Sequence, residues 1–189
     1  MGWEFDILNG IQSVFQSDLM DQIMPAVTAL GNGGIFWIAA GLVFTLYKKT
    51  RIFGICILTA LVFEVLSCNV ILKPLVARPR PFTSDPARIL LIPRPEDYSF
   101  PSGHTAVSFA AASAAWFMKK RKTGVAFGAV ACLIAFSRLY LYVHYPTDVL
   151  AGAVIGILCG AAASRLTEMA AAAREARKGS GPEIPVGKL

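Results

Sequence analysis

The chain has 189 residues, of which 55% are apolar or aromatic and 16% are charged, and its mean hydropathy is +0.56. Soluble proteins carry roughly 25% charged residues, so this composition excludes an ordinary soluble globule. It also excludes a disordered chain, which requires low hydrophobicity and high charge. The formal net charge is +6, and the chain holds two histidines, His104 and His144. The composition indicates a membrane protein.

The first twenty residues are typical of an amphipathic helix that lies in the membrane interface. Apolar residues recur there at helical spacing, and acidic and amide side chains separate them. A cleaved signal peptide is not expected, because such a peptide begins with basic residues and this segment carries acidic ones.

Five further segments are apolar enough to cross a membrane, which takes about 20 mostly apolar residues. They are residues 22–47, 52–72, 98–118, 123–143 and 146–164. We therefore predict an all-α fold, a polytopic bundle of five transmembrane helices plus the N-terminal interfacial helix, six helices in all. Residues 1–166 would form the membrane domain, and residues 167–189 a charged cytoplasmic tail that is partly disordered.

Basic residues predict the orientation, because lysine and arginine accumulate on the cytoplasmic side of membrane proteins. Three basic clusters follow the first, third and fifth segments, so they share one face. They are Lys48, Lys49 and Arg51; Lys119, Lys120, Arg121 and Lys122; and Arg165, Arg174, Arg177 and Lys178. This pattern predicts a multi-pass protein of the cell membrane with its N-terminus outside and its C-terminus in the cytoplasm.

The remaining cations map to the outer side, against this rule, and an anion that binds there would account for them. Both histidines fall on the same side. The outer cations are Lys73, Arg78, Arg80, Arg88, Arg94 and Arg138.

Two of the outer features predict a phosphate site. Ser102 is a favoured N-cap residue, and Gly103 lets backbone approach closely, so the helix that begins there would offer free N–H groups to an anion. Lys73, Arg80 and Arg138 would add side-chain donors to the phosphate oxygens.

The histidines and one carboxylate predict the chemistry. Pro146 suits the first position of a helix, which puts Asp148 in the first turn and His144 just before it. The carboxylate could then accept a proton from one ring nitrogen of His144 and leave the other free as a nucleophile. His104 would be the general acid. These residues alone do not decide which histidine is the nucleophile.

Each residue also has a simpler interpretation. Lys73 and Arg80 could be anchors that reach the lipid headgroups, Asp148 an acidic helix start, and His104 a hydrogen-bonded structural histidine. The convergence of two histidines, three cations and one carboxylate on one face favours a phosphate site.

Three motifs carry a family resemblance: Lys73-x6-Arg80-Pro81, Pro101-Ser102-Gly103-His104 and Ser137-Arg138-x5-His144-x3-Asp148. Together they resemble the signature of the type 2 phosphatidic acid phosphatase superfamily, which includes bacterial lipid phosphatases, undecaprenyl-diphosphate phosphatases and vanadium haloperoxidases. Arg78-Pro79 is a second Arg-Pro pair, and the family spacing selects Arg80.

The resemblance implies roles for eight residues. His144 would attack phosphorus and become phosphohistidine, Asp148 would orient it, and His104 would protonate the leaving group and later activate water. The phosphate oxygens would be held by Lys73, Arg80, Arg138, Ser102 and the Gly103 backbone. No metal or other cofactor is implied.

The leading hypothesis is an integral-membrane lipid phosphatase that acts at the outer leaflet through phosphohistidine. Undecaprenyl diphosphate is the first candidate substrate, and phosphatidic acid, phosphatidylglycerophosphate and lipid A phosphates are alternatives. A lipid transporter or scramblase is the alternative of a different class, but it has no need for two histidines and a paired carboxylate. A vanadate-dependent peroxidase is not expected in so short a membrane chain. No nucleic-acid partner is expected.

Other features have several interpretations. Glu64, within the second segment, is either functional or part of a polar packing network with Ser67 and Asn69, and the network is favoured. Gly152, Gly156 and Gly160 form a ridge of small residues that would pack inside the bundle or support a homodimer. The amphipathic segment 82–100 is a candidate wall or lid of the site. The four cysteines fall singly in apolar stretches and predict neither a disulfide scaffold nor a zinc site.

Overall fold

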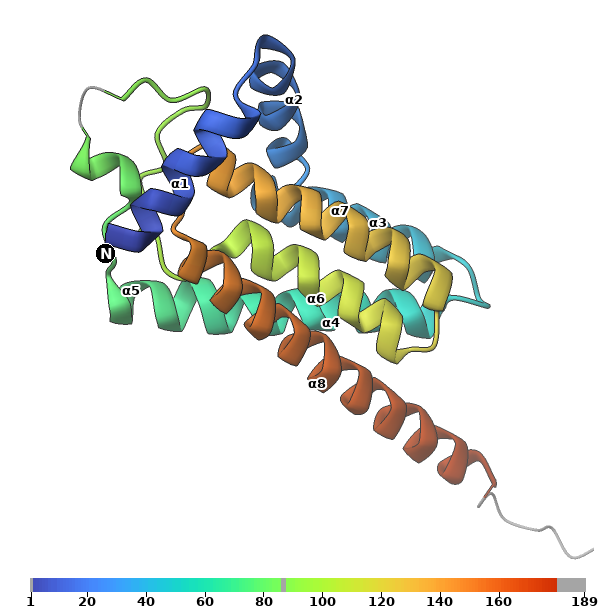
Figure 1. Ribbon diagram of the computed structural model, residues 1–189. Coiled ribbons are helices and arrows are strands. Elements are labelled where there is room, and N and C mark those ends of the chain that lie inside the picture. Colours follow the sequence, from blue (N-terminus) through green and yellow to red (C-terminus); the bar gives the residue numbers. More distant parts are fainter. Residues whose placement is uncertain (1, 86–87, 180–189) are drawn as a thin grey trace, which may run out of the picture.

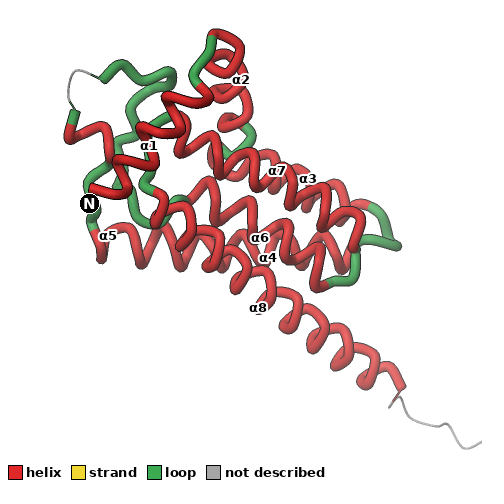
Figure 2. Tube along the Cα trace, in the orientation of Figure 1, coloured by secondary structure: helices red, strands yellow, loops and turns green. Residues whose placement is uncertain are grey.

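The computed structural model describes residues 2–85 and 88–179, and every regular element within them is helical. The elements before the site segment are α1 (Gly2–Phe15), α2 (Asp18–Ala29), the 3₁₀ turn η1 (Asn32–Gly34), α3 (Ile35–Leu46), α4 (Arg51–Glu64), the π-helical stretch η2 (Val65–Leu72) and α5 (Lys73–Val76). The elements that follow are the 3₁₀ turn η3 (Pro81–Ser84), α6 (Gly103–Phe117), α7 (Arg121–Tyr140) and α8 (Pro146–Gly179) (Figure 2).

Helix α6 is the centre of the bundle. It packs against α4, α7 and α8, and α3 lies beside α4 (Figure 1). Helices α1 and α2 lie across one end of the bundle, and α8 projects beyond the other end. The chain therefore has two unlike ends, one covered by helices and connections and one from which a single helix extends.

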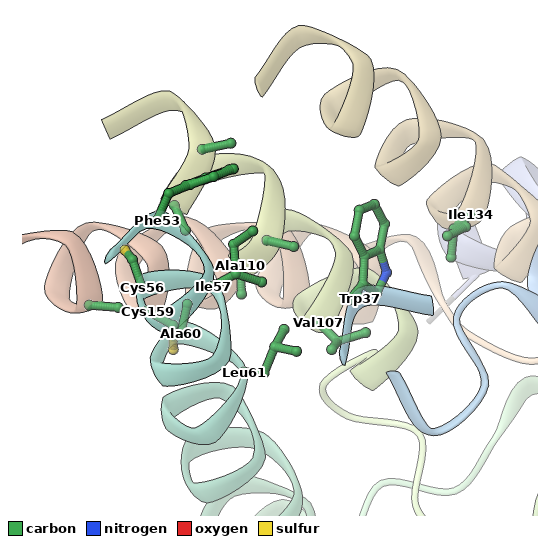
Figure 3. Packing of buried hydrophobic residues seen from close by; sticks show 14 residues of the cluster. Trp37, Phe53, Cys56, Ile57, Ala60, Leu61, Val107, Ala110, Ile134 and Cys159 are labelled. Carbon is green, nitrogen blue, oxygen red and sulfur yellow. The ribbon is translucent and has the colours of Figure 1, made fainter. Parts of the chain in front are cut away.

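Large side chains of α3 and α4 fill the core against the small residues of α6. Trp37, Phe53 and Ile57 are buried there next to Val107 and Ala110 (Figure 3). Their burial alone does not fix the rotation of the helices, but a polar contact does. The Trp37 Nε1–H donates to Ser108 Oγ at 3.0 Å, which aligns α3 with the start of α6.

The glycine ridge of α8 packs against α6 within the same chain. A Cβ atom added at Gly156 would lie 2.3 Å from the carbonyl oxygen of Ala106, and one at Gly160 would lie 2.7 Å from that of Ala110. Such distances leave no room for a side chain. The ridge is therefore used for packing inside the bundle and is not free for a dimer contact.

The N-terminal part differs from the prediction in two ways. The amphipathic helix ends at Phe15 rather than near residue 20, because Ser17 caps a new helix, α2. The predicted first span is bent by 45° between α2 and α3. Gly33 and Gly34 cause the break, because both adopt positive φ angles, +56° and +66°, which other residues rarely do.

The predicted count of five spans is not confirmed. In the described part of the chain, three helices are long and apolar enough to cross a membrane, those that begin at Arg51, Arg121 and Pro146. The bent pair α2–α3 would be a fourth. Helix α6 begins at Gly103 rather than at residue 98, and its 15 residues reach about 22 Å, short of the roughly 30 Å hydrocarbon core.

Helix α8 is longer than the predicted fifth span. It continues without a break from Pro146 through Arg165 to Gly179. Its 34 residues reach about 51 Å, well beyond the thickness of a bilayer core. The predicted disorder of the tail falls on residues 180–189, which lie outside the described residues.

Candidate active site

The candidate site is a cavity of about 740 Å³ at the end of the bundle that α1 and α2 cover. Six of the eight predicted site residues line it: Lys73, Arg80, Gly103, His104, Arg138 and His144. The other two, Ser102 and Asp148, are fully buried behind them. The structure thus brings together side chains from four separate parts of the chain.

Arg80 is held on three sides. Its Nε–H donates to the carbonyl oxygen of Asp97 at 2.8 Å, and its Nη1 donates to the carbonyl oxygen of Val143 at 2.7 Å. Nη1 also lies 3.1 Å from His144 Nε2. Because a guanidinium group can only donate, His144 Nε2 must accept, and the ring proton of a neutral His144 must be on Nδ1.

The Nδ1 side of His144 faces Asp148, although not at hydrogen-bond distance. Nδ1 lies 3.7 Å from Asp148 Oδ2 and 3.5 Å from Ser99 Oγ, whose hydroxyl donates to the same carboxylate oxygen at 2.5 Å. Ser99 therefore lies between the histidine and its carboxylate.

His144 is 1% exposed in the connection between α7 and α8. Burial and the positive charges of Arg138 and Arg80 lower the pKa of His144 well below its usual 6.5. The imidazole is therefore neutral at physiological pH, which is the state in which a ring nitrogen can attack an electrophile.

Asp148 is fixed by a second arginine, on the side away from His144. Arg78 Nη1 donates to Asp148 Oδ1 at 2.5 Å, and Arg78 Nη2 donates to Glu4 Oε2 at 2.6 Å. The guanidinium stacks on the Tyr145 ring at 3.9 Å. Glu4 in turn accepts from the Thr147 hydroxyl at 2.6 Å. The N-terminal helix α1 is thereby connected to the carboxylate of the site.

Lys73 and Arg80 share a carboxylate that the sequence did not predict in the site. Asp97 Oδ1 accepts from Arg80 Nη2 at 2.5 Å, and Asp97 Oδ2 pairs with Lys73 Nζ. Burial raises the pKa of Asp97, but hydrogen bonds and charge from Lys73 and Arg80 outweigh it and lower that pKa to about 2. Asp97 is therefore ionised at every ordinary pH.

His104 faces the same cavity from the start of α6. Its Nε2 lies 2.8 Å from Asn32 Oδ1, so its partner is an amide rather than a carboxylate. The η1 turn comes so close that a Cβ at Gly31 would lie 2.6 Å from His104 Cδ2. The two histidines thus have different surroundings, a carboxylate for His144 and an amide for His104.

Arg138 is the third cation of the cavity and is almost fully buried. Its Nη1 donates to Thr28 Oγ1 at 2.8 Å, and its Nε has no hydrogen-bond partner. Glu64 also lines the cavity, is 1% exposed, and its Oε1 has no partner. Two unsatisfied polar atoms therefore belong to residues that line this one cavity.

Ser102 occupies the N-cap position of α6, as predicted, but its hydroxyl makes no capping bond and lies 2.9 Å from Thr105 Oγ1. Its backbone N–H donates to the carbonyl oxygen of Asp148 at 3.0 Å, which joins the second motif to the third. A Cβ at Gly103 would lie 3.7 Å from Lys73 Nζ, so a side chain there would reduce the space next to that ammonium group.

Residues 49–171, which include all eight predicted site residues, match the PAP2 superfamily. The chain belongs to the PAP2 superfamily. Its helical architecture and candidate membrane helices make it a multi-pass membrane protein of that family.

Curated PAP2 relatives differ in substrate. An undecaprenyl-diphosphatase of Sulfolobus acidocaldarius is 32% identical over 120 residues, which are 64% of this chain and 58% of that protein. A lipid A 4'-phosphatase of Porphyromonas gingivalis is 32% identical over 166 residues, 82% of this chain and 68% of that protein. The chain thus spans less than two thirds of the Sulfolobus relative.

Two solved structures share the PAP2 fold. The transmembrane PAP2-type phosphatidylglycerolphosphate phosphatase of Bacillus subtilis has a TM-score of 0.74 and 26% identity, covering 89% of this chain and 86% of that one. Aquifex aeolicus LpxE has a TM-score of 0.72 and 27% identity, covering 85% of this chain and 94% of that one.

Sequence reasoning missed several residues in or next to the candidate site: Glu4, Thr28, Asn32, Arg78, Asp97 and Ser99. Arg78 carried a signal, because it is an outer cation next to a proline. Asp97 is an acid beside an arginine-rich motif and offered a weaker one. Thr28 and Asn32 carried none, because their partners Arg138 and His104 are 110 and 72 positions away.

Proposed function

We propose that this protein is a metal-independent lipid phosphatase that acts through a phosphohistidine at His144. One observation carries the proposal: Arg80 donates to His144 Nε2, so the lone pair of that nitrogen faces the cations of the cavity. Asp148 lies on the Nδ1 side, where it would stabilise the positive charge that develops on the ring during attack.

The reaction has two steps. His144 Nε2 attacks the terminal phosphorus, and the bond from that phosphorus to the bridging oxygen of the leaving group, a lipid alcohol or a lipid phosphate, breaks. Protonated His104 gives its proton to that oxygen. Neutral His104 then takes a proton from water, whose oxygen displaces His144 and releases inorganic phosphate. Lys73, Arg80 and Arg138 would stabilise the charge on the phosphate oxygens in both steps.

For the substrate we propose undecaprenyl diphosphate first, because the site lies at one end of the bundle and its relatives include undecaprenyl-diphosphatases. Phosphatidylglycerophosphate, phosphatidic acid and lipid A phosphates are the alternatives, and relatives named for two of these activities match this chain. All these substrates share a terminal phosphate group on a lipid.

For the membrane arrangement we propose five spans, with α2–α3 as one bent span and α6 as a short span buried inside the bundle. A buried helix needs less apolar length, since its neighbours face the lipid. The basic residues support an outer site and a cytoplasmic C-terminus. A homodimer through helix packing stays a proposal and would need a surface other than the glycine ridge.

The test is phosphate release by purified protein from a panel of these four lipids, with metal chelator present and with orthovanadate as inhibitor. We expect His144→Ala to abolish turnover, at least 10³-fold, because it removes the nucleophile. Tyr98→Phe, an exposed change at the same end, is the control and should keep full activity. Turnover of water-soluble phosphates alone would contradict the lipid assignment, and lipid transport that survives His144→Ala would favour a transporter.

A further inference from the structure

In this site the cations that would bind a phosphate already hold an anion, the carboxylate of Asp97. One oxygen of Asp97 bonds Arg80 Nη2, and the other pairs with Lys73 Nζ. Two oxygens of a phosphate would bridge the same two cations in the same manner. The side chains of Lys73 and Arg80 are 12% and 4% exposed, whereas that of Asp97 is 51% exposed. The cations belong to the cavity wall, and the carboxylate lies at its rim.

The Asp97 side chain can leave without displacing Arg80. Arg80 Nε bonds the backbone carbonyl of Asp97, and Nη1 bonds the Val143 carbonyl, so neither contact depends on the carboxylate. Rotation of the half-exposed Asp97 side chain would free Nη2 of Arg80 and the Lys73 ammonium group, and leave the guanidinium in place. The freed donors would then point into the cavity.

Asp97 is also a permanent anion. Burial raises its pKa, but the hydrogen bonds and charges of Lys73 and Arg80 keep that pKa at about 2. Protonation therefore does not clear the site at any pH at which the protein would work. An incoming phosphate group must compete with the carboxylate.

We propose that Asp97 is an internal competing anion, which the substrate phosphate must displace from Lys73 and Arg80. The inference rests on the proposed function, since it takes these two cations as the partners of the substrate. Only molecules in which Asp97 has left the two cations can then bind a phosphate there. The apparent affinity is therefore the intrinsic affinity multiplied by the fraction of such molecules. The same competition assists release of the phosphate product.

This competition also selects among lipids. A terminal phosphate carries close to two negative charges at neutral pH, whereas a phosphodiester headgroup carries one and exposes fewer free oxygens. A phosphodiester therefore displaces the carboxylate less well. Asp97 would keep abundant diester lipids off Lys73 and Arg80 and admit lipids with a terminal phosphate.

The experiment measures binding of orthovanadate and of inorganic phosphate to the full chain in detergent micelles, without any lipid substrate. We expect Asp97→Asn to bind both about tenfold more tightly, because charge-assisted hydrogen bonds no longer compete with the ligand. Asp97→Ala should do the same, and Asp97→Glu, which keeps the charge, should stay close to the unchanged protein. Thermal melts of each variant establish that it is folded.

Glu96→Gln is the matched control. Glu96 is the exposed neighbour of Asp97, and the substitution removes the same charge from the same segment. We expect its vanadate affinity to change less than twofold. An equal gain in vanadate affinity in Glu96→Gln and Asp97→Asn would overturn the proposal, because the loss of one negative charge would then explain the gain without any contact of Asp97 with the cations.

A second measurement tests the selection among lipids. Phosphatidylglycerol, a phosphodiester, is added to the micelles as a competitor of vanadate. We expect it to inhibit vanadate binding to Asp97→Asn at several-fold lower concentration than vanadate binding to the unchanged protein. If folded Asp97→Asn binds vanadate and phosphate no more tightly than the unchanged protein, the inference about Asp97 is wrong. That result would not contradict the proposed phosphatase function. Absence of vanadate and phosphate binding in the unchanged protein would instead count against the phosphatase.

Discussion

At the scale of single residues, the carboxylate of Asp148 shows how the site is held in position. Ser99 and the backbone N–H of Tyr145 donate to Oδ2, and Arg78 donates to Oδ1. A fully buried carboxylate needs such partners, because an unsatisfied charge would be costly in the interior. None of these three residues lines the cavity, and Arg78 is the charged one among them, paired with the carboxylate that faces His144.

We predict that Arg78→Gln lowers kcat about 10- to 100-fold with little change in KM, by analogy with the loss of a hydrogen-bond partner that orients a metal-ligating side chain. Arg78→Lys should restore only part of the rate, because an ammonium group cannot reach Asp148 and Glu4 in two directions. Steady-state kinetics of lipid hydrolysis measures both values.

Arg88→Gln is the control for this prediction. Arg88 also stacks on a tyrosine, at 3.7 Å from the Tyr142 ring, but has no contact with Asp148. Its loss should leave kcat within twofold. A folded Arg78→Gln protein with unchanged kcat would show that Arg78 has no positioning role.

At the scale of elements, the site depends on how closely α8 approaches α6. Gly152 of α8 lies opposite Ser102, where an added Cβ would be 2.6 Å from the Ser102 carbonyl oxygen. Asp148 and His104 lie near the starts of these two helices. The glycine ridge therefore sets the distance between the two sides of the site as well as the packing of the bundle.

We predict that Gly156→Ala destabilises the protein by about 1–3 kcal/mol, because its Cβ would overlap the Ala106 carbonyl oxygen and push the helices apart. Activity should fall with stability, since α6 carries His104. Gly128→Ala in α7 is the matched control, because nothing lies within 4 Å of its added Cβ. That change should preserve or raise the melting temperature, as alanine favours helix over glycine. Equal melting temperatures for the two variants would contradict the packing argument.

At the scale of the whole molecule, two basic connections between helices lie at the opposite end from the site. The basic connections α3–α4 and α6–α7 lie at the end from which α8 projects, and the cavity lies at the end under α1 and α2 (Figure 1). The charge distribution supports a cytoplasmic position for the first end. In the proposed topology the site would meet lipids of the outer leaflet.

We predict that an impermeant maleimide labels Ile89→Cys in intact cells and does not label Lys120→Cys until the membrane is opened. Ile89 is 90% exposed on the site side, and Lys120 is exposed at the opposite end. Both variants are made in a background without the four native cysteines. Labelling of Lys120→Cys alone in intact cells would reverse the orientation and place the site in the cytoplasm.

The apolar segments predicted α4, α7 and most of α8 well, because a long uncharged stretch has few alternatives to a membrane helix. The bend between α2 and α3 was missed, since residues 31–34 are uncharged and do not interrupt the hydropathy. The early end of α1 was missed for a similar reason, because the Ser17 cap lies within a continuing amphipathic pattern.

The sequence by itself determined the helical membrane character, the family and six of the residues that line the cavity, because these follow from composition and from motifs that are local in the chain. Tertiary structure alone decided which partners these groups have. It put Asp97 on the cations, Arg78 behind Asp148 and Asn32 on His104, through contacts 24, 70 and 72 positions apart. Such contacts depend on how helices pack, and no local pattern in the chain encodes that packing.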